Sequence, residues 1–396
     1  MIDTSTTHDN KEKVAILAER MLPGSIPKVT GNEVKYLDEL GYYSEVLTIM
    51  EGGIPKENYQ FKQFLEGIKV RELSREMKLL RKFHFKFPFF SFLSGYHLAS
   101  PFLAHKVIKK SEYDLLFGLN SIVCLTAYQI ARNCKIPYIA CMWDPMSYIL
   151  PKVYYDKLPK TLFLLMLKAA ESMDKFIIEK SAVTLSLSEK HAEQLRKLSD
   201  DANVEVVYLG CDPIKKIPES RGDFILAIDR WDRGNLPHLL LDVVQHLDQK
   251  TKLIVAGFWS EDRLLYSFKK AIKEKKLEDQ VDICGPVSEK KLKELYLKAR
   301  VWIHPIEETS FSMPAMEAAS HGCPVIAPQG IPLLEHGKHG YFPPINDIEQ
   351  YAELLNKLTS NERLAWKLGK NAWDVAKKYT WEYHAQQLDV IINKYI

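Results

Sequence analysis

The stretch FILAIDRWDRGNLPHLLLDVV, residues 224–244, contains the unit from which the fold is built. A short apolar run ends at Asp229, a charged loop follows, and apolar residues then recur with the spacing of one helix face. Further apolar runs, each separated from the next by a helical pattern, predict strands at 252–257, 281–285, 301–305 and 324–328. Strands that alternate with helices are typical of a parallel sheet covered on both faces. The second half of the chain is therefore predicted to be a doubly wound α/β domain.

The first half repeats this architecture. Strands are expected at 13–19, 113–119, 137–143, 182–188 and 204–210, with a helix at 121–134 and one long helix over 154–179. The prolines and charges of 211–220 predict a linker. The chain thus predicts two Rossmann-like domains, 1–211 and 212–378. Ligand is expected in a central cleft between them, outside the carboxyl ends of the strands.

Composition excludes several classes of protein. Net charge is +3, so charge alone gives no reason to expect a nucleic-acid partner. The six cysteines lack a CxxC pair and are expected to be reduced thiols, as in a cytoplasmic protein. No apolar signal-peptide core and no run of about 20 apolar residues is found. The pair His336 and His339 lies in a glycine-rich turn without an acid or cysteine cluster, so no metal and no cofactor are expected.

Two groups in the second half suit an anionic nucleotide. Arg230 and Arg233 follow a strand end, where arginine can clamp a diphosphate; alternatively they pair with Asp229 and Asp232 at the surface. In TSFSMPAMEAASHGCPVIA, residues 309–327, Pro314 predicts a helix start near 312, and a helix start attracts anions. The residues assigned to this start are Ser310, Phe311, Ser312 and Met313.

Glu317 is the one acid of that stretch and lies one turn into the helix. A carboxylate there cannot hold phosphate, but it can accept two hydrogen bonds from a diol such as ribose. The alternative is a solvated acid near a helix dipole. In the first half, Asp144 in CMWDPMSY follows a strand end and could bind sugar hydroxyls or act as a base; alternatively it caps the turn before Pro145.

A basic and aromatic segment, residues 62–110, holds 11 Lys or Arg against three Glu around FHFKFPFFSFL. Two interpretations stay open. The phenylalanines either pack into the core of the first domain, or they dip into an anionic membrane surface while the lysines meet headgroups. The second interpretation would suit a lipid-linked acceptor.

At these residues the chain resembles the family 4 retaining glycosyltransferases (glycosyltransferase group 1) of GT-B fold, most closely over 224–343. Their marker, EGFGLPVLEAMACGxPVIA, is similar to residues 309–327. The resemblance implies that Glu317 binds the ribose and that Arg230 binds the diphosphate. Thr309 stands where the family has its first Glu, with Glu308 one residue earlier as a candidate sugar contact. Asn235 stands where a Lys is usual, and Arg233 could supply that charge.

The resemblance also implies roles for residues outside this motif. It implies that backbone near Gly285 and Val287 holds the base, and that the loop of Gly24 closes over donor and acceptor. Trp143, followed by Asp144, stands where a His is frequent. Residues 379–396 resemble the final helix that crosses back to the first domain.

The function implied is a metal-independent transferase that moves a sugar from a UDP- or GDP-sugar to a hydroxyl acceptor, glycan or lipid-linked, with Arg230, Asp144 and Glu308 as catalytic candidates. It would work in the cytoplasm, or peripherally on the inner face of the membrane. Because several motif residues are replaced, two alternatives are kept. One is an inactive transferase-like partner subunit, and the other is a nucleotide-sugar epimerase.

Overall fold

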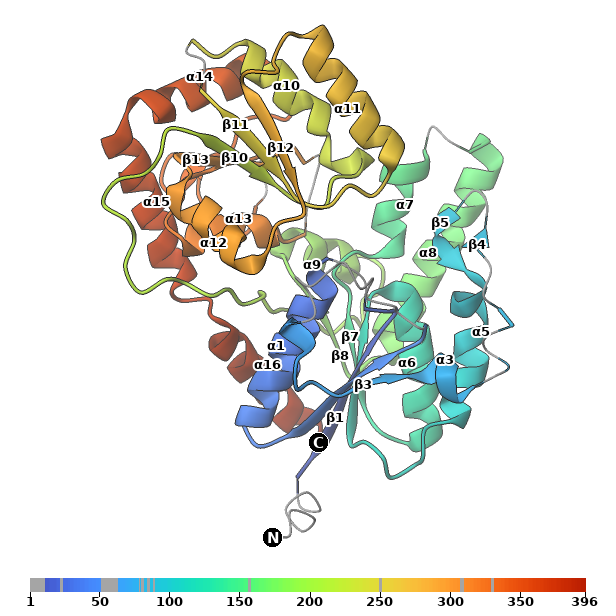
Figure 1. Ribbon diagram of the computed structural model, residues 1–396. Coiled ribbons are helices and arrows are strands. Elements are labelled where there is room, and N and C mark those ends of the chain that lie inside the picture. Colours follow the sequence, from blue (N-terminus) through green and yellow to red (C-terminus); the bar gives the residue numbers. More distant parts are fainter. Residues whose placement is uncertain are drawn as a thin grey trace. The chain divides into compact units, whose positions relative to one another are not determined.

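A computed structural model describes residues 11–21, 24–50, 63–77, 79, 82–83, 86–87, 90–155, 158–248, 251–306, 310–328 and 331–396. The chain forms two compact units, one of residues 1–208 with 384–396 and one of residues 209–383. The sequence predicted that the first domain ends at residue 211, and that the second domain ends at residue 378 before the final helix. Each unit is an α/β domain with its own sheet and core (Figure 1).

The first domain is built on a parallel sheet in the order β3-β2-β1-β6-β7-β8-β9. Its strands are β1 Lys13–Ala18, β2 Tyr43–Thr48, β3 Val70–Glu72, β6 Leu115–Leu119, β7 Tyr138–Cys141, β8 Val183–Ser186 and β9 Val204–Val206. A separate antiparallel pair joins β4 Lys86–Phe87 and β5 Phe90–Ser94. Buried runs such as Val14–Ala18 explain the sheet, because strands covered on both faces are apolar at every position.

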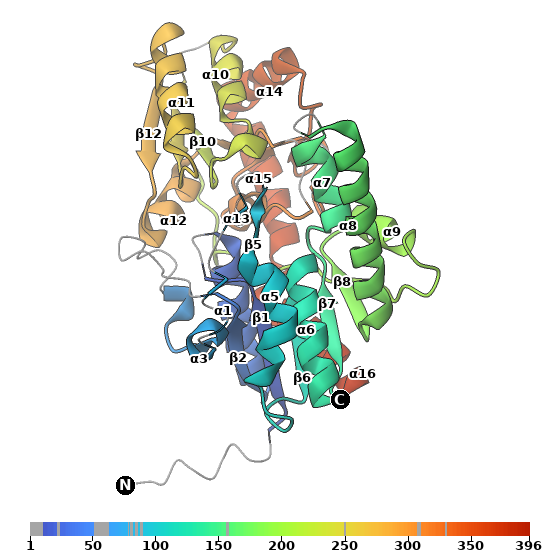
Figure 2. The same cartoon turned by 90° about the vertical axis from the view of Figure 1, so that its right-hand side faces the viewer.

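Helices connect and cover these strands, as Figure 2 shows for α5, α6 and α8. They are α1 Ser25–Glu39, α3 Leu73–Glu76, α5 Gly95–Leu103, α6 Ser121–Cys134, α7 Met146–Tyr154, α8 Lys160–Lys180 and α9 Glu189–Arg196, with short 3-10 turns at Gln63–Leu65 and Ala104–Lys106. The single long helix predicted over 154–179 is wrong at its start. Pro159 caps a new helix, so α7 ends and α8 begins there, since proline suits a helix start and not its interior.

The second domain has a parallel sheet in the order β12-β11-β10-β13-β14-β15. Its strands are β10 Ile225–Ile228, β11 Leu253–Ala256, β12 Val281–Gly285, β13 Val301–Ile303, β14 Val325–Ile326 and β15 Gly340–Tyr341. Its helices are η3 Arg233–Asn235, α10 Pro237–Gln245, α11 Asp262–Glu274, α12 Glu289–Lys298, α13 Met313–Ser320, α14 Ile348–Ser360 and α15 Glu362–Ala376. The α10 helix packs against α11 and α14, and α13 packs against α15.

The last helix, α16 Trp381–Tyr395, begins in the second domain and ends in the first. Tyr42 donates to Asp389 Oδ1 at 2.7 Å, and His384 lies 3.1 Å from Glu33 of α1, so α16 lies beside α1 (Figure 1). The predicted α/β fold of two Rossmann-like domains with a returning final helix is confirmed. Among the helices of the described residues, none has the length and apolar character needed to span a bilayer.

Candidate functional site

The second sheet reverses its strand order between β10 and β13. Loops that follow the two strands at such a point diverge, which makes the carboxyl edge there a common ligand site in α/β domains. The loop after β10 carries Arg230, and the segment after β13 leads into α13 and Glu317. Two parts of the chain that the sequence singled out separately therefore follow neighbouring strands.

The main chain of Arg230 is fixed by its neighbours. Its N–H donates to Asp229 Oδ1 at 2.6 Å, and its carbonyl accepts from Asn235 Nδ2 at 2.6 Å. The guanidinium is 57% exposed and lies 3.1 Å from Asp232 Oδ2. An exposed pair of this kind contributes little stability, so an anion can replace Asp232 as the partner of Arg230 at small cost. Arg233 lies in the turn Arg233–Asn235, and its side chain lies outside the described residues.

Asn235 holds the loop instead of adding charge to it. The residue is buried, and its amide group bonds the carbonyl of Arg230. Asp232 begins the same turn by accepting from Gly234 N at 3.0 Å. The replacement of the usual Lys by Asn thus removes a positive charge and adds a hydrogen bond that fixes the main chain of Arg230.

A buried histidine faces Asp229 across the switch point. His304 follows β13, is 1% exposed, and its Nε2 lies 2.5 Å from Asp229 Oδ2. The ring of Trp302 packs beside it at 5.2 Å. The carboxylate of Asp229 thus accepts a hydrogen bond from Arg230 N at Oδ1 and lies against the ring of His304 at Oδ2. This contact ties the arginine loop to the end of β13.

The start of α13 agrees with the predicted cap. Ser312 Oγ accepts from Ala315 N at 3.3 Å, and Pro314 occupies the first turn. The side chains of the helix start, Ser310, Phe311, Ser312 and Met313, are buried. Because Pro314 has no N–H and Ala315 donates to Ser312, neither can donate to a ligand. Glu308 and Thr309 lie outside the described residues.

Glu317 is half-buried and faces a tyrosine of α12. Tyr296 donates its hydroxyl to Glu317 Oε2 at 3.1 Å, and His321 stacks on the phenol ring with centroids 5.3 Å apart. Burial, and then the Glu317 carboxylate, hold the pKa of Tyr296 well above its usual value. The phenol thus stays a donor at physiological pH and orients the carboxylate.

Besides burial, both Glu317 and the arginine loop affect the pKa of Tyr296. The charge of Asp229 also raises the pKa of Tyr296, after the effects of burial and Glu317. The arginine loop and Glu317 therefore lie near one buried phenol. Val287, the expected contact for a base, is half-buried in the loop after β12, at the same edge of the sheet.

In the first domain, Gly24 caps α1 with φ 147°, a backbone angle that favours glycine. This places the predicted loop after β1, before a 15-residue helix. Asp144 is exposed and lies between the carboxyl end of β7 and α7. In the sheet, β6 lies between β1, which precedes Gly24, and β7, which precedes Asp144.

A buried carboxylate holds the segment that carries Asp144. Asp174 of α8 accepts from Ser147 N at 2.8 Å, and Ser121 Oγ accepts from Met146 N at 3.0 Å. Burial raises the pKa of Asp174, although hydrogen bonds from Ser147 and Ser121 oppose the shift. These bonds satisfy the first amides of α7. The place of Asp144 is thus set by groups on α6 and α8.

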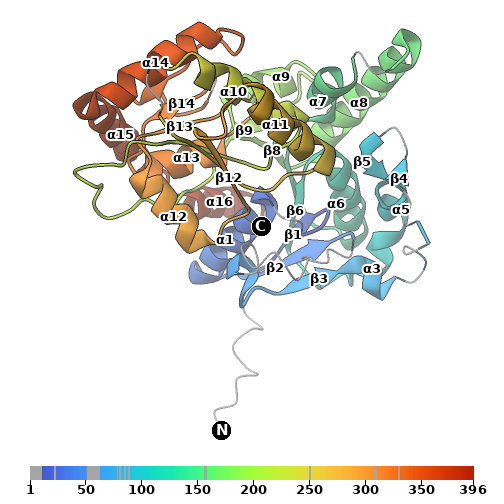
Figure 3. The same ribbon diagram turned by 45° about the horizontal axis from the view of Figure 1, so that its top comes forward.

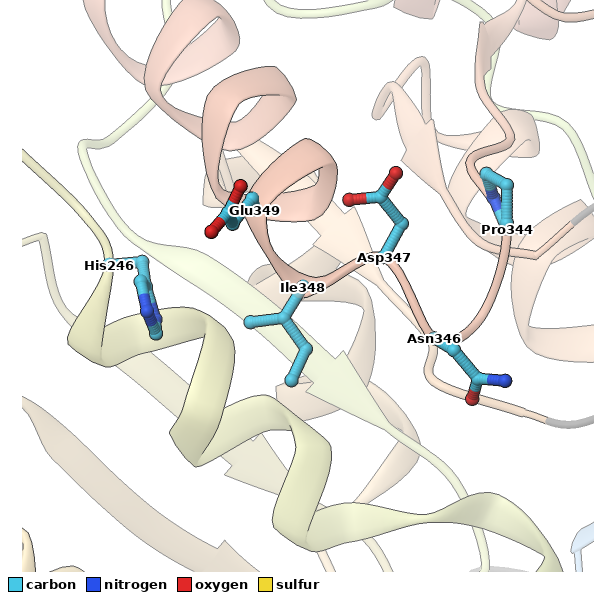
Figure 4. A pocket seen from close by; sticks show the side chains of 6 residues that line it. All are labelled: His246, Pro344, Asn346, Asp347, Ile348 and Glu349. Atoms are coloured by element: carbon cyan, nitrogen blue, oxygen red, sulfur yellow. The ribbon is translucent and has the colours of Figure 1, made fainter.

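A hollow of about 580 Å³ lies elsewhere in the second domain, between the end of α10 and the start of α14 (Figure 4). Its acid Asp347 caps α14 by accepting from Gln350 N at 2.9 Å, and His246 Nδ1 lies 2.8 Å from Asp242 O. Asp347 and His246 therefore make hydrogen bonds to the main chain of the adjoining helices. None of the predicted site residues lines the hollow. Across the described part of the chain, no three His, Cys, Asp or Glu side chains gather as metal ligands would.

Sequence reasoning missed Asp229, His304, Tyr296 and Asp174 as parts of these sites. The sequence predicted Asp229 only as a surface partner of the arginines. The shared place of Asp229 and His304 at the ends of β10 and β13 was a usable signal, because neighbouring parallel strands end at one edge. Tyr296 and Asp174 lie on helices and gave no such signal.

Comparison with known proteins identifies relatives. Residues 213–374 match the family model described as glycosyl transferases group 1. A D-inositol 3-phosphate glycosyltransferase of Corynebacterium kroppenstedtii is 24% identical over 49% of this chain and 48% of its own length. The mannosylfructose-phosphate synthase of Agrobacterium fabrum is 29% identical over 43% of this chain and 40% of its own length. The match thus spans about half the length, or less, of these curated relatives.

Solved structures share the fold over nearly the whole chain. Anabaena Alr3699/HepE, in complex with UDP and glucose, has a TM-score of 0.75 and 17% identity, covering 97% of this chain and 100% of its own. The sucrose-phosphate synthase of Thermosynechococcus elongatus has a TM-score of 0.76 and 16% identity, covering 97% and 99%.

Proposed function

We propose that the chain is a group 1 glycosyl transferase that moves a sugar from a nucleotide-sugar to a hydroxyl acceptor, because residues 213–374 match that family model and the fold is that of solved GT-B structures. The observation that carries the proposal is that two suitable side chains follow neighbouring strands at one edge of the sheet. Arg230 is exposed and its main chain is fixed by hydrogen bonds, and Glu317 is oriented by Tyr296. UDP and UDP-glucose occupy structural neighbours of the chain, which supports a UDP-sugar as the donor. Retention of configuration follows from the family resemblance.

In the proposed mechanism, Arg230 neutralises the charge that builds on the leaving diphosphate. That interaction accelerates the reaction because it is stronger in the transition state than in the ground state. The α13 start adds its dipole, but two of its first three amides cannot donate, so Arg230 carries most of this task. Glu317 accepts hydrogen bonds from the ribose and fixes the register of the donor. Asp144 and Glu308 are proposed as sugar contacts.

Arg230→Ala tests the donor site. Charge-assisted hydrogen bonds contribute about 1.5–3 kcal/mol, so we expect UDP to bind roughly 10- to 150-fold more weakly. Calorimetric titration with UDP, GDP and ADP without added metal measures the effect and identifies the base. Arg263→Ala, an exposed arginine of α11, is the matched control and should bind as wild type does.

Saturable binding by wild type and loss in Arg230→Ala would establish the donor site. Absence of binding of any nucleotide would contradict the proposal and would favour a transferase-like partner subunit. Release of free sugar from a bound donor then separates an active enzyme from a binding protein, because a working transferase leaks some sugar to water.

Glu317→Ala should weaken UDP binding by about 1–3 kcal/mol, because polar groups of the ribose lose their partner in a half-buried place. The readout is the ratio of affinities for UDP and for its 2′,3′-dideoxy analogue. We expect wild type to prefer UDP and the variant to lose that preference. Tyr296→Phe keeps the ring but removes the donor to Glu317, and should give a smaller loss. An unchanged preference in Glu317→Ala would refute the ribose role.

A further inference from the structure

The first two turns of α8 expose leucines to solvent. Leu162, Leu164 and Leu165 have 43%, 52% and 63% of their surface exposed, while Phe163 between them is buried. A helix segment that is apolar around most of its circumference is normally buried on every side. This segment is buried on one side alone, so something outside the described chain is expected to cover the rest.

The segment belongs to a helical hairpin with a small core of its own. Figure 3 shows α7 and α8 running side by side. Leu150 of α7 and Phe163 of α8 form an apolar cluster separate from the main core of the domain. Tyr155, which directly follows α7, is 68% exposed. Exposed apolar surface is thus concentrated where the two helices meet in the chain.

Charge in this region is mainly positive. Residues 155–170 contain three lysines and one acid, Asp156. Lys160 and Lys168 are exposed beside the leucines. The acids of α8, namely Glu171, Asp174 and Glu179, all come later in the helix.

We propose that this hairpin tip, defined as Tyr155, Lys160, Leu162, Leu164, Leu165 and Lys168, docks on an anionic lipid surface. Leucines that enter the headgroup region, lysines that meet lipid phosphates and a tyrosine at the boundary are the side chains such a surface binds. A second copy of the chain fits less well. A two-fold dimer would bring the same lysine-bearing patch against itself, and like charges would face one another.

Docking of the tip would bring a lipid-carried acceptor close to Asp144, and this step rests on the proposed function. The nine residues of α7 span about 13 Å from its start, which directly follows Trp143, Asp144 and Pro145, to its end beside Tyr155. A tip held in headgroups would keep Asp144 roughly one helix length from the bilayer. A hydroxyl acceptor carried by a lipid would thus come within reach of the sugar contact proposed for Asp144.

Vesicle co-sedimentation without any nucleotide tests the docking. The full chain is mixed with vesicles of phosphatidylcholine, or of phosphatidylcholine with phosphatidylglycerol. The test variant is L162Q/L164Q/L165Q, because glutamine keeps helix propensity. The control variant L40Q/Y266Q/V390Q removes exposed apolar side chains of 43%, 73% and 66% exposure elsewhere on the chain. A charge variant, K160E/K168E, leaves the leucines in place.

We expect wild type and control to bind the anionic vesicles alone, and both tip variants to need at least roughly tenfold more lipid for half-binding. Equal binding by wild type and the leucine variant would overturn the proposal and would favour the basic and aromatic segment 62–110 as the membrane contact. Absence of wild-type binding, or a dimer in size-exclusion chromatography that the leucine variant abolishes, would overturn it too. Circular dichroism checks that each variant is folded. UDP titration of the same samples reports the donor site separately, so failure of docking and failure of the proposed function remain distinguishable.

Discussion

Arg221→Ala is expected to lower the free energy of unfolding of the second domain by about 3–5 kcal/mol. The buried guanidinium donates from Nη1 to the carbonyls of Tyr296, Leu297 and Ala299, and from Nη2 to that of His321. Burial lowers the pKa of Arg221, as it does for a cation held by dipoles. Its loss would leave the last carbonyls of α12 and α13 buried without donors, and such groups are costly.

The same substitution should also weaken UDP binding, because α12 carries Tyr296 and α13 carries Glu317. Arg221 bonds both helix ends and so sets the distance between those two side chains. We infer that it acts on the site through them. The two effects should therefore appear together.

Urea unfolding followed by tryptophan fluorescence measures the effect on stability. Six of the seven tryptophans lie in residues 209–383, so the signal reports mainly the second domain. Arg221→Lys keeps the charge but cannot reach four carbonyls, and should be intermediate. Arg363→Ala, at an exposed position of α15, is the control and should stay within about 0.5 kcal/mol of wild type. A midpoint for Arg221→Ala equal to that of the control would contradict the role.

The sequence was most informative where local and global signals agree. The helix start at Ser312 followed from Ser, Pro and the apolar run, and the structure has the cap there. The alternation of strands and helices predicted both sheets because central strands such as β6 and β10 are apolar along their length. The sequence singled out Arg230 and Glu317 separately, and the strand order of the second sheet places them after the neighbouring strands β10 and β13.

Elements that depend on distant partners were not predictable in this way. β2 has the sequence YSEVLT and no apolar run, so it was overlooked. Its Glu45 is buried, with Lys69 Nζ at 2.7 Å and the Tyr113 hydroxyl as a further partner. Those partners are 24 and 68 residues away, and without them a buried acid argues against a strand. The tyrosine that orients Glu317 is hidden for the same reason.

Breaking the pair Glu33 and His384 is expected to destabilise the first domain at the contact between α1 and α16. His384 Nδ1 lies 2.9 Å from Tyr208 O, and Nε2 lies 3.1 Å from Glu33 Oε1. Each ring nitrogen thus lies within hydrogen-bonding distance of an oxygen atom. Both side chains are about 5% exposed or less. Removal of one partner leaves a buried polar group without its hydrogen bond, which costs about 1–3 kcal/mol.

His384→Ala should therefore loosen α16 from α1, the helix that Gly24 caps. Hydrogen exchange followed by mass spectrometry resolves this locally, and a loss of about 3 kcal/mol corresponds to roughly hundredfold faster exchange in α16. The double variant E33A/H384A should be less unstable than the two single losses added together, since it leaves neither partner buried alone. Tyr42→Phe, which removes the neighbouring bond to Asp389, is the control and should cost only about 1 kcal/mol. Additive single losses would show that the two side chains pack independently, and that α1 is held by the apolar side chains of α16 instead of by this pair.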